Sequence, residues 1–257
     1  MSNKIELNVL REGQGPIVVL SHALGCDLHM WDGVAALLAR AHTVIRYDHR
    51  NHGGSAKSTE AFGIETLADD VIGLIEREAP GETVHFVGLS MGGMTAQALA
   101  ARRPDLLRSV TIANSSAFYP DQSPWRARVE MVAQQGVAAI APGAVSRWLT
   151  PEWVSTFEGE AAAKALQDTL EKTDANGYIA SCNAVAAIDF RQSNHRIAVP
   201  TLVIGGLQDE ATPMPMSKEM ADAIPGARLL TINAAHLSAV ERPADFTNLL
   251  IDFWRSL

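Results

Sequence analysis

The pentapeptide Gly88-Leu89-Ser90-Met91-Gly92 carries the clearest chemistry in this chain, because it has the Gly-x-Ser-x-Gly form. An apolar, β-branched run (83–87) precedes it, and a stretch of small residues with a helical pattern (91–102) follows it. A strand that turns sharply into a helix strains the serine backbone and lifts the hydroxyl above the sheet edge. Glycines on both sides avoid a collision within the turn. We therefore predict that Ser90 is a nucleophile.

A serine hydroxyl needs a base to accept its proton and a carboxylate to orient that base. Among the eight histidines, His236 is the best candidate, since it lies in a loop between an expected strand and the last expected helix. Asp209 is the best candidate for the carboxylate, because it follows the preceding expected strand through a Gly-Gly turn. Its neighbour Glu210 is the main alternative. These residues predict a Ser–His–Asp triad.

Acyl transfer through a serine also needs two backbone N–H donors for the oxyanion that develops. Met91 supplies one at the start of the helix after Ser90, where the helix dipole favours negative charge. We expect the second from the loop after the predicted strand 17–21, which reads His22-Ala23-Leu24-Gly25.

The composition is that of a globular protein, with 257 residues, 47% hydrophobic residues and a net charge of −8. The acidic balance, without runs of like charge, argues against nucleic acid or an anionic membrane as partner. Cys26 and Cys182 are far apart and have no metal-ligand spacing, and no dinucleotide-binding glycine motif is present, so we expect no metal and no cofactor. No apolar leader begins the chain, and no apolar stretch is long enough to span a membrane, so we expect a cytoplasmic protein.

The chain alternates β-rich apolar runs with helical patterns, which predicts an α/β fold with a mostly parallel sheet. The expected strands are 5–10, 17–21, 43–47, 83–87, 107–112, 201–204 and 228–232.

The alternation stops between residues 118 and 196, where only helical patterns occur. The expected helices there are 125–135, 137–148, 160–173 and 178–188. We therefore predict a core domain made of residues 1–117 and 197–257, with residues 118–196 inserted as a helical cap (lid) over the carboxyl ends of the strands.

With these motifs the chain resembles the α/β-hydrolase superfamily over essentially its whole length, and within it the 3-oxoadipate enol-lactonases. The resemblance rests on residues 21–31, 46–53, 88–93, 147–151 and 235–238. The order Ser90, Asp209, His236 is that of the superfamily. In related enzymes the loop that carries the second oxyanion donor begins with His-Gly and the next residue donates. Leu24 holds that place here, although Ala23 replaces the glycine.

The resemblance implies a serine hydrolase that opens a small enol-lactone through an acyl-enzyme, in the catabolism of aromatic compounds. Such a substrate carries a free carboxylate, for which Arg147 is our chosen partner, beside Trp148 as a pocket wall. The other candidate arginines are Arg126, Arg128, Arg191 and Arg196.

His49 and Asn51 depart from the family pattern, which has a small residue and a glycine there, and we expect both at the pocket mouth. The alternatives to a lactonase are a carboxylesterase, a perhydrolase-like enzyme, a C–C bond hydrolase, and a non-catalytic ligand-binding protein of the same fold. A homo-oligomer is left open.

Overall fold

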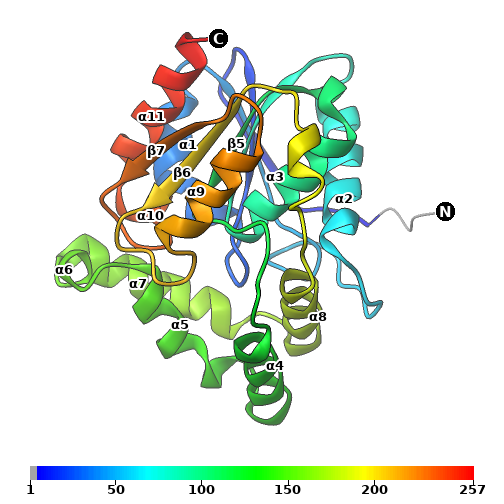
Figure 1. Cartoon of the computed structure of the whole chain (residues 1–257). Helices are drawn as coiled ribbons and strands as arrows, with labels where there is room; N and C mark the ends of the chain where they lie inside the picture. The colour runs from blue at the N-terminus through cyan, green and yellow to red at the C-terminus, as the bar shows by residue number, and fades with distance from the viewer. Residues whose placement is uncertain (1–4) are drawn as a thin grey trace.

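The computed structural model describes residues 5–257 and contains a seven-stranded sheet in the order β1-β3-β2-β4-β5-β6-β7 (Figure 1). Only β1 runs antiparallel, against β3, and all the other neighbouring strands are parallel. The strands are β1 (Val9–Glu12), β2 (Ile17–Ser21), β3 (Thr43–Tyr47), β4 (Val84–Leu89), β5 (Leu107–Ala113), β6 (Thr201–Gly206) and β7 (Arg228–Ile232). The predicted α/β fold is confirmed.

From β2 the chain first adds β3 on one side and then crosses over to add β4 on the other side, so β2 lies between β3 and β4. The register pairs Ser21, the last residue of β2, with Gly88 near the end of β4. The loops that leave these two strands therefore begin side by side. Open α/β sheets bind their ligands at such a switch point, outside the carboxyl ends of the strands.

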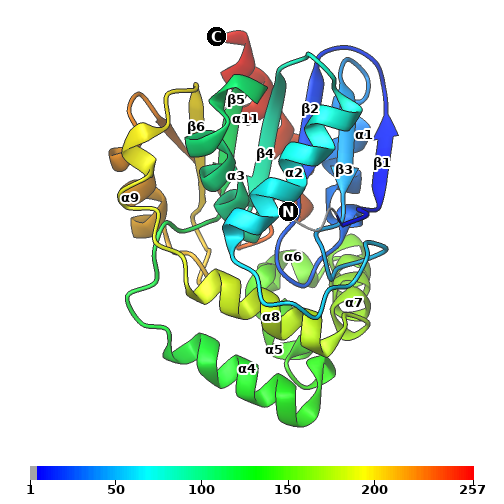
Figure 2. The same ribbon diagram turned by 90° about the vertical axis from the view of Figure 1, so that its right-hand side faces the viewer.

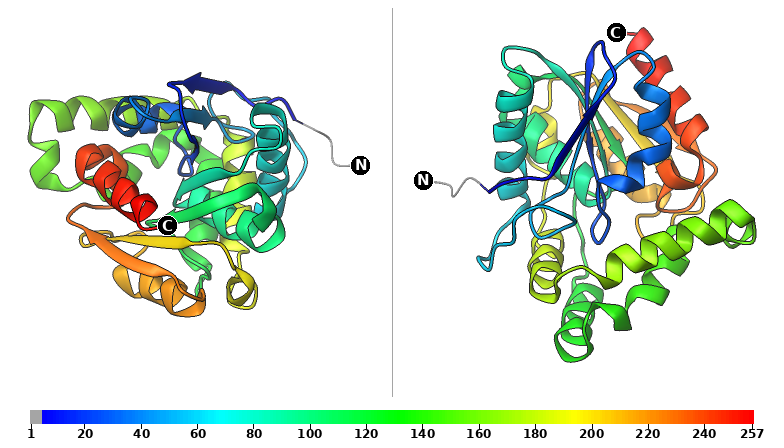
Figure 3. Two further views of the ribbon diagram at one scale, coloured as in Figure 1. Left: turned by 90° about the horizontal axis from the view of Figure 1, so that it is seen from above. Right: turned by 180° about the vertical axis from the view of Figure 1, so that it is seen from behind.

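Helices cover both faces of the sheet, as Figures 2 and 3 show. On one face lie α2 (Ile64–Glu78), α3 (Met91–Arg102) and α9 (Met214–Ala223), and on the other lie α1 (Asp32–Leu38) and α11 (Pro243–Arg255). The short α10 (Ser238–Glu241) leads into α11, whose first residue is a proline, as suits the first turn of a helix. α3 is buried along almost its whole length, which its small side chains allow.

Between β5 and β6 the chain leaves the sheet and forms the cap, which lies below the strands in Figure 2. Its helices are α4 (Ser123–Gln135), α5 (Ala141–Trp148), α6 (Pro151–Val154), α7 (Phe157–Glu171) and α8 (Ala175–Ala186). The two ends of the insertion meet, since Phe118 pairs with Asp189 and the N–H of Phe190 donates to the carbonyl of Ala117 (2.8 Å). The inserted helical segment agrees with the sequence, while the domain limits of 117/118 and 196/197 remain our own division.

Several element ends differ from the expected ones. The first strand forms at Val9–Glu12 rather than at 5–10, because its partners on β3 run from Val44 to Tyr47. The expected helix 137–148 is split into a 3-10 turn (Val137–Ala139) and α5, which begins one residue before Pro142. The helices α6 and α9 were not predicted: α6 has only four residues, and α9 lies between two strands whose apolar runs dominate the pattern.

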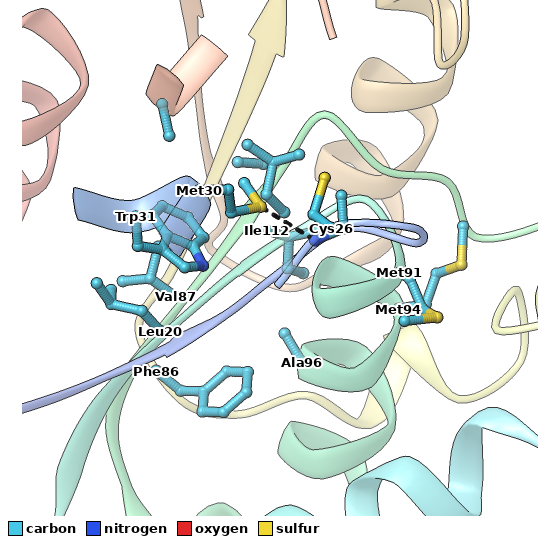
Figure 4. Close-up of a cluster of buried hydrophobic side chains, with 14 of the residues drawn as sticks. Leu20, Cys26, Met30, Trp31, Phe86, Val87, Met91, Met94, Ala96 and Ile112 are labelled. Atoms are coloured by element: carbon cyan, nitrogen blue, oxygen red, sulfur yellow. Dashed lines mark hydrogen bonds between the residues drawn. The ribbon is translucent and has the colours of Figure 1, made fainter. Parts of the chain in front are cut away.

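The core surrounds the central strands, and Figure 4 shows part of it. Leu20 of β2, Phe86 of β4 and Ile112 of β5 are completely buried, as is Met94 of α3. Each such side chain contributes on the order of 2 kcal/mol relative to exposure. Cys26 and Cys182 are buried free thiols.

Within residues 5–257, no helix combines the length and the apolar character needed to cross a membrane. Residues 1–4, part of the stretch in which we expect no leader, lie outside the described residues.

We predict that Gly92→Ala destabilises the protein by at least about 2 kcal/mol, because a Cβ there would collide with the carbonyl and hydroxyl oxygens of Ser21 on β2. Gly73→Ala, on α2, is the matched control: nothing lies within 4 Å of its Cβ, so it should stabilise the helix by about 0.5–1 kcal/mol. Urea unfolding of both variants measures this. Equal stability of the two would show that α3 does not pack as closely on β2 as described.

Candidate active site

Ser90 lies at the turn between β4 and α3 in a left-handed backbone conformation, with φ 57° and ψ −114°. Three hydrogen bonds hold this turn. The N–H of Ser90 donates to the carbonyl of Ala113 (2.9 Å), and the carbonyl of Ser90 accepts from the N–H of Met94 (3.0 Å) and from the hydroxyl of Ser115 (2.8 Å). The Gly-x-Ser-x-Gly pattern therefore forms the strand–turn–helix that the sequence predicted.

The structure brings the three residues of the predicted triad together. His236 Nε2 lies 3.0 Å from Ser90 Oγ, and Nδ1 of the same ring lies 2.9 Å from Oδ2 and 3.1 Å from Oδ1 of Asp209. The ring therefore donates from Nδ1 to the carboxylate, which leaves Nε2 to accept the serine proton. Glu210, the alternative to Asp209, is exposed and makes no bond to His236.

Asp209 is buried and accepts hydrogen bonds on both carboxylate oxygens. Oδ1 accepts from the N–H groups of Ala211 (2.8 Å) and Thr212 (2.9 Å), and Oδ2 accepts from the Thr212 hydroxyl (2.7 Å) and from Asn114 Nδ2 (2.9 Å). Burial raises the pKa of this carboxyl, but the charge of His236 and these hydrogen bonds outweigh it and lower the pKa of Asp209 to about 2. Asp209 is therefore ionised at neutral pH.

The backbone N–H groups of the loop after β2 differ in whether they find an acceptor. The N–H of Ala23 donates to Met30 Sδ (3.3 Å, Figure 4), that of Gly25 to His52 Nε2 (3.1 Å), and that of Cys26 to the carbonyl of Ala23 (3.2 Å). Within the described chain, the N–H of Leu24 has no acceptor. The same is true of the N–H of Met91 at the start of α3. These are the two donors that we expected to form an oxyanion hole.

Ser90 and His236 open into a cavity of about 430 Å³ between the core and the cap. Trp148 forms part of the wall, as predicted, and both Arg128 and Arg147 line it. The other lining residues are Leu24, Tyr119, Pro120, Asp121, Pro124, Trp125, Glu210, Ala211, Thr212, Pro213 and Met216. The volume suits a small organic ligand.

A model of the alpha/beta hydrolase fold family matches residues 16–243. The chain belongs to this family. The 3-oxoadipate enol-lactonase 2 of Acinetobacter baylyi is 34% identical to it over 247 residues, which cover 95% of this chain and 91% of the relative. The chain is therefore an α/β hydrolase related to enol-lactonases.

Two solved structures are similar to this α/β hydrolase. The enol-lactonase from Burkholderia xenovorans superposes with a TM-score of 0.93 at 35% identity, over 99% of this chain and 98% of the other. A thermophilic esterase from Thermogutta terrifontis, solved with malate bound, superposes with a TM-score of 0.91 at 26% identity, over 98% and 94% of the two chains.

His49 and Asn51 do not lie at the pocket mouth, so this expectation is corrected. Both are buried, with 1% and 2% exposed, and neither lines the cavity. Asn51 has φ 67°, a conformation that glycine adopts freely and that Asn tolerates better than most other residues. Asn can therefore replace the family's glycine without a change in the backbone. Three of the five candidate arginines, Arg126, Arg191 and Arg196, also do not line the cavity.

His49 instead belongs to a buried cluster of three imidazoles, those of His22, His49 and His52, beside the loop 22–25. His22 Nδ1 donates to the carbonyl of Ala23 (2.7 Å), and its Nε2 accepts the N–H of His49 (2.9 Å). His52 donates from Nδ1 to the carbonyl of Arg50 (3.1 Å) and accepts the N–H of Gly25. Since one nitrogen of each of these two rings must accept, both rings are neutral in this arrangement.

Burial sets the protonation of this histidine cluster. Desolvation lowers the pKa of His22 and takes that of His49 well below its ordinary value. The pKa of His52 falls to about 3 for the same reason, with a further contribution from His22. The loop 22–25 therefore contacts uncharged imidazoles at neutral pH.

Sequence reasoning missed Asn114 and Thr212, which hold Asp209, and Tyr119, which lines the cavity. Asn114 directly follows β5, and a polar residue at the carboxyl end of a central strand is the signal that could have found it. No group of three or more metal-ligating side chains that could hold an ion occurs in residues 5–257.

We predict that the free energy of unfolding falls as the pH drops below about 6.5, because the unfolded chain then binds protons that the buried imidazoles do not. Each such histidine contributes a slope of up to about 1.4 kcal/mol per pH unit, which continues down to its folded pKa. His49→Leu should make this slope shallower, as measured by urea unfolding at pH 7.5, 6 and 5.

The control is His195→Gln, an exposed position, which should leave the slope unchanged. An unaltered slope in His49→Leu would show that His49 takes up a proton in the folded state.

Proposed function

We propose that this α/β hydrolase opens a small, carboxylate-bearing enol-lactone, with Ser90 as nucleophile, His236 as base and Asp209 as the carboxylate that orients the base. The hydrogen-bonded chain from Ser90 Oγ through His236 to Asp209 carries the proposal. It lies at the wall of a cavity whose two arginines form no ion pair within the described residues. The enol-lactonases among the relatives support the choice of substrate class.

In the first step, His236 Nε2 takes the proton of Ser90 Oγ as the oxygen attacks the lactone carbonyl. The resulting imidazolium is stabilised by ionised Asp209, whose low pKa keeps it from accepting the proton. The carbonyl oxygen becomes an oxyanion, and the backbone N–H groups of Leu24 and Met91 are the donors that we assign to it.

Collapse of this intermediate breaks the ring C–O bond and leaves an acyl-enzyme. The leaving group is an enolate, which departs easily and stays attached to the acyl chain because the substrate is a ring. His236 returns its proton to the leaving group, which becomes a ketone on tautomerisation. A water molecule, deprotonated by His236, then hydrolyses the ester to Ser90 and releases the acid.

Arg128 and Arg147 are the groups that we propose for the substrate carboxylate. Neither forms an ion pair within residues 5–257, whereas Arg191 of the cap is paired with Asp189. Arg128 is half-buried on α4, with its guanidinium 4.9 Å from the Trp125 ring centre, whereas Arg147 is exposed. Burial raises the pKa of Tyr178 on α8, and the Arg128 guanidinium opposes that rise. Arg128 therefore lies close to α8.

Purified protein should hydrolyse an enol-lactone with a free carboxylate at a kcat/KM at least about tenfold above that for p-nitrophenyl acetate, because only the lactone uses the arginines as well as the triad. Ser90→Ala should lose at least about a thousandfold of kcat on both substrates, with an unchanged circular dichroism spectrum. A serine-directed phosphonate should label the wild type and not the variant. A preference for the neutral ester would instead identify a general carboxylesterase.

Arg128→Gln should raise KM for the carboxylate-bearing lactone roughly tenfold, since one charge-assisted hydrogen bond is lost from a half-buried site. Arg147→Gln should raise it less, because solvent screens an exposed guanidinium. KM for p-nitrophenyl acetate should not change. Arg126→Gln, on the same helix but outside the cavity, is the matched control. An equal effect of Arg128→Gln on both substrates would show that Arg128 supports the cap rather than the ligand.

A further inference from the structure

Glu241 is a buried carboxylate that none of the steps above uses. It ends α10, five residues after His236, and its side chain is 0% exposed. Among the described residues, Glu241 pairs with Arg242, whose Nε lies 4.0 Å from Oε1. Such a weakly paired buried carboxylate needs strong hydrogen bonds to offset its desolvation.

Three hydrogen bonds supply this, and they come from two different parts of the chain. Oε1 accepts the hydroxyl of Thr150 (2.6 Å), and Oε2 accepts the N–H groups of Thr150 (3.1 Å) and Ala235 (3.2 Å). Thr150 lies in the cap, between α5 and α6, whereas Ala235 belongs to the loop that carries His236. Glu241 therefore joins the cap to this loop.

The two residues that flank His236 are thus both bonded, directly or through Glu241, to the same cap segment. The N–H of Leu237 donates to the carbonyl of Trp148 (2.8 Å), and the N–H of Ala235 is tied to Thr150 through Glu241. The side chain of Trp148 lines the cavity. One short segment of the cap, 148–150, therefore meets both the pocket and the backbone on each side of His236.

We propose that Glu241 is a positioning residue that fixes His236 against the cap, so that the base faces Ser90 only when the cap segment 148–150 is in place. The proposal rests on the roles given above to Ser90, Asp209 and His236. Because a displacement of about 1 Å in a reacting group can lower a rate about a hundredfold, loss of the Glu241 contacts should reach the chemistry.

Glu241→Gln and Glu241→Ala separate the hydrogen bonds from the charge. A glutamine oxygen in the place of Oε2 can still accept both N–H groups. Its amide nitrogen, in the place of Oε1, can donate to the Thr150 hydroxyl, which is able to accept. Alanine removes all three bonds. Gln should therefore rescue the function that Ala loses.

The kinetic test uses p-nitrophenyl acetate, so that it does not depend on the lactone. We expect Glu241→Ala to lower kcat about tenfold or more with KM nearly unchanged, and Glu241→Gln to stay within about threefold of the wild type. Ile75→Ala, a buried substitution on α2, is the control for destabilisation alone and should keep kcat. If Glu241→Ala keeps kcat and loses only thermal stability, the positioning role is wrong.

A spectroscopic test is independent of any turnover. The His236 Nδ1–H, hydrogen-bonded to Asp209, should give a low-field proton resonance, assigned by its loss in His236→Gln. We expect this resonance to shift or broaden in Glu241→Ala and to be retained in Glu241→Gln. If Glu241→Ala does not fold, Thr150→Val removes one of the three bonds to Glu241, together with the bond that the Thr150 hydroxyl accepts from the N–H of Trp153 (3.4 Å). It should lower kcat about threefold and perturb the resonance. An unchanged resonance and kcat in that variant would overturn the proposal.

An inactive wild type whose resonance still responds to Glu241 would contradict the proposed hydrolase function and leave the positioning of His236 standing.

Discussion

The left-handed backbone of Ser90 is the constraint on which the rest of the site depends. A non-glycine residue with φ 57° costs on the order of 1–3 kcal/mol, and it persists only where its surroundings hold it. Here the end of β5, the first turn of α3 and the hydroxyl of Ser115 all bond to its peptide groups. Gly92 lets α3 approach β2, which also places the loop after β2 beside the serine. If this turn relaxed, the Ser90 hydroxyl and the N–H of Met91 would both be displaced.

The buried titratable groups around this turn differ in charge. Asp209 is buried as an anion because several donors meet its oxygens, whereas the imidazoles of His22, His49 and His52 are buried uncharged. A protonated imidazole at His52 would place an N–H against the N–H of Gly25 and displace the loop 22–25. Negative charge is thus held on the side of the base, and neutral acceptors support the side where an oxyanion would form. A substitution that kept the volume of one of these side chains but changed its charge or its hydrogen bonds would not preserve this arrangement.

The sequence predicts well what depends on local pattern. The strands β2, β3 and β7 were bounded correctly, and the turn at Ser90 and the loop of His236 lie where their motifs place them, because each combines periodicity with turn chemistry. The sequence could not predict individual side-chain contacts between different elements of the fold. We expect His49 at the pocket because it departs from the family pattern, yet the fold buries it against Ser21 and His22. Asn114 and Glu241 contact the triad loops from 95 and 6 residues away, and no spacing rule reveals such tertiary bonds.

The charges of the whole chain and of the cavity bear on how an anionic ligand would bind. The chain has 29 acidic against 21 basic side chains, so an anion approaching from a distance meets repulsion that salt screens beyond about 10 Å. The cavity wall itself carries Arg128 and Arg147 as well as Asp121 and Glu210, and neither arginine forms an ion pair within residues 5–257. An anionic ligand would therefore be selected by what it touches in the cap rather than by steering. Ser90, Asp209, His236 and the N–H groups of Leu24 and Met91 belong to the core, whereas Arg128, Arg147 and Trp148 belong to the cap. Glu241 lies where these two parts meet, which is why a carboxylate outside the triad is worth testing for its effect on the base.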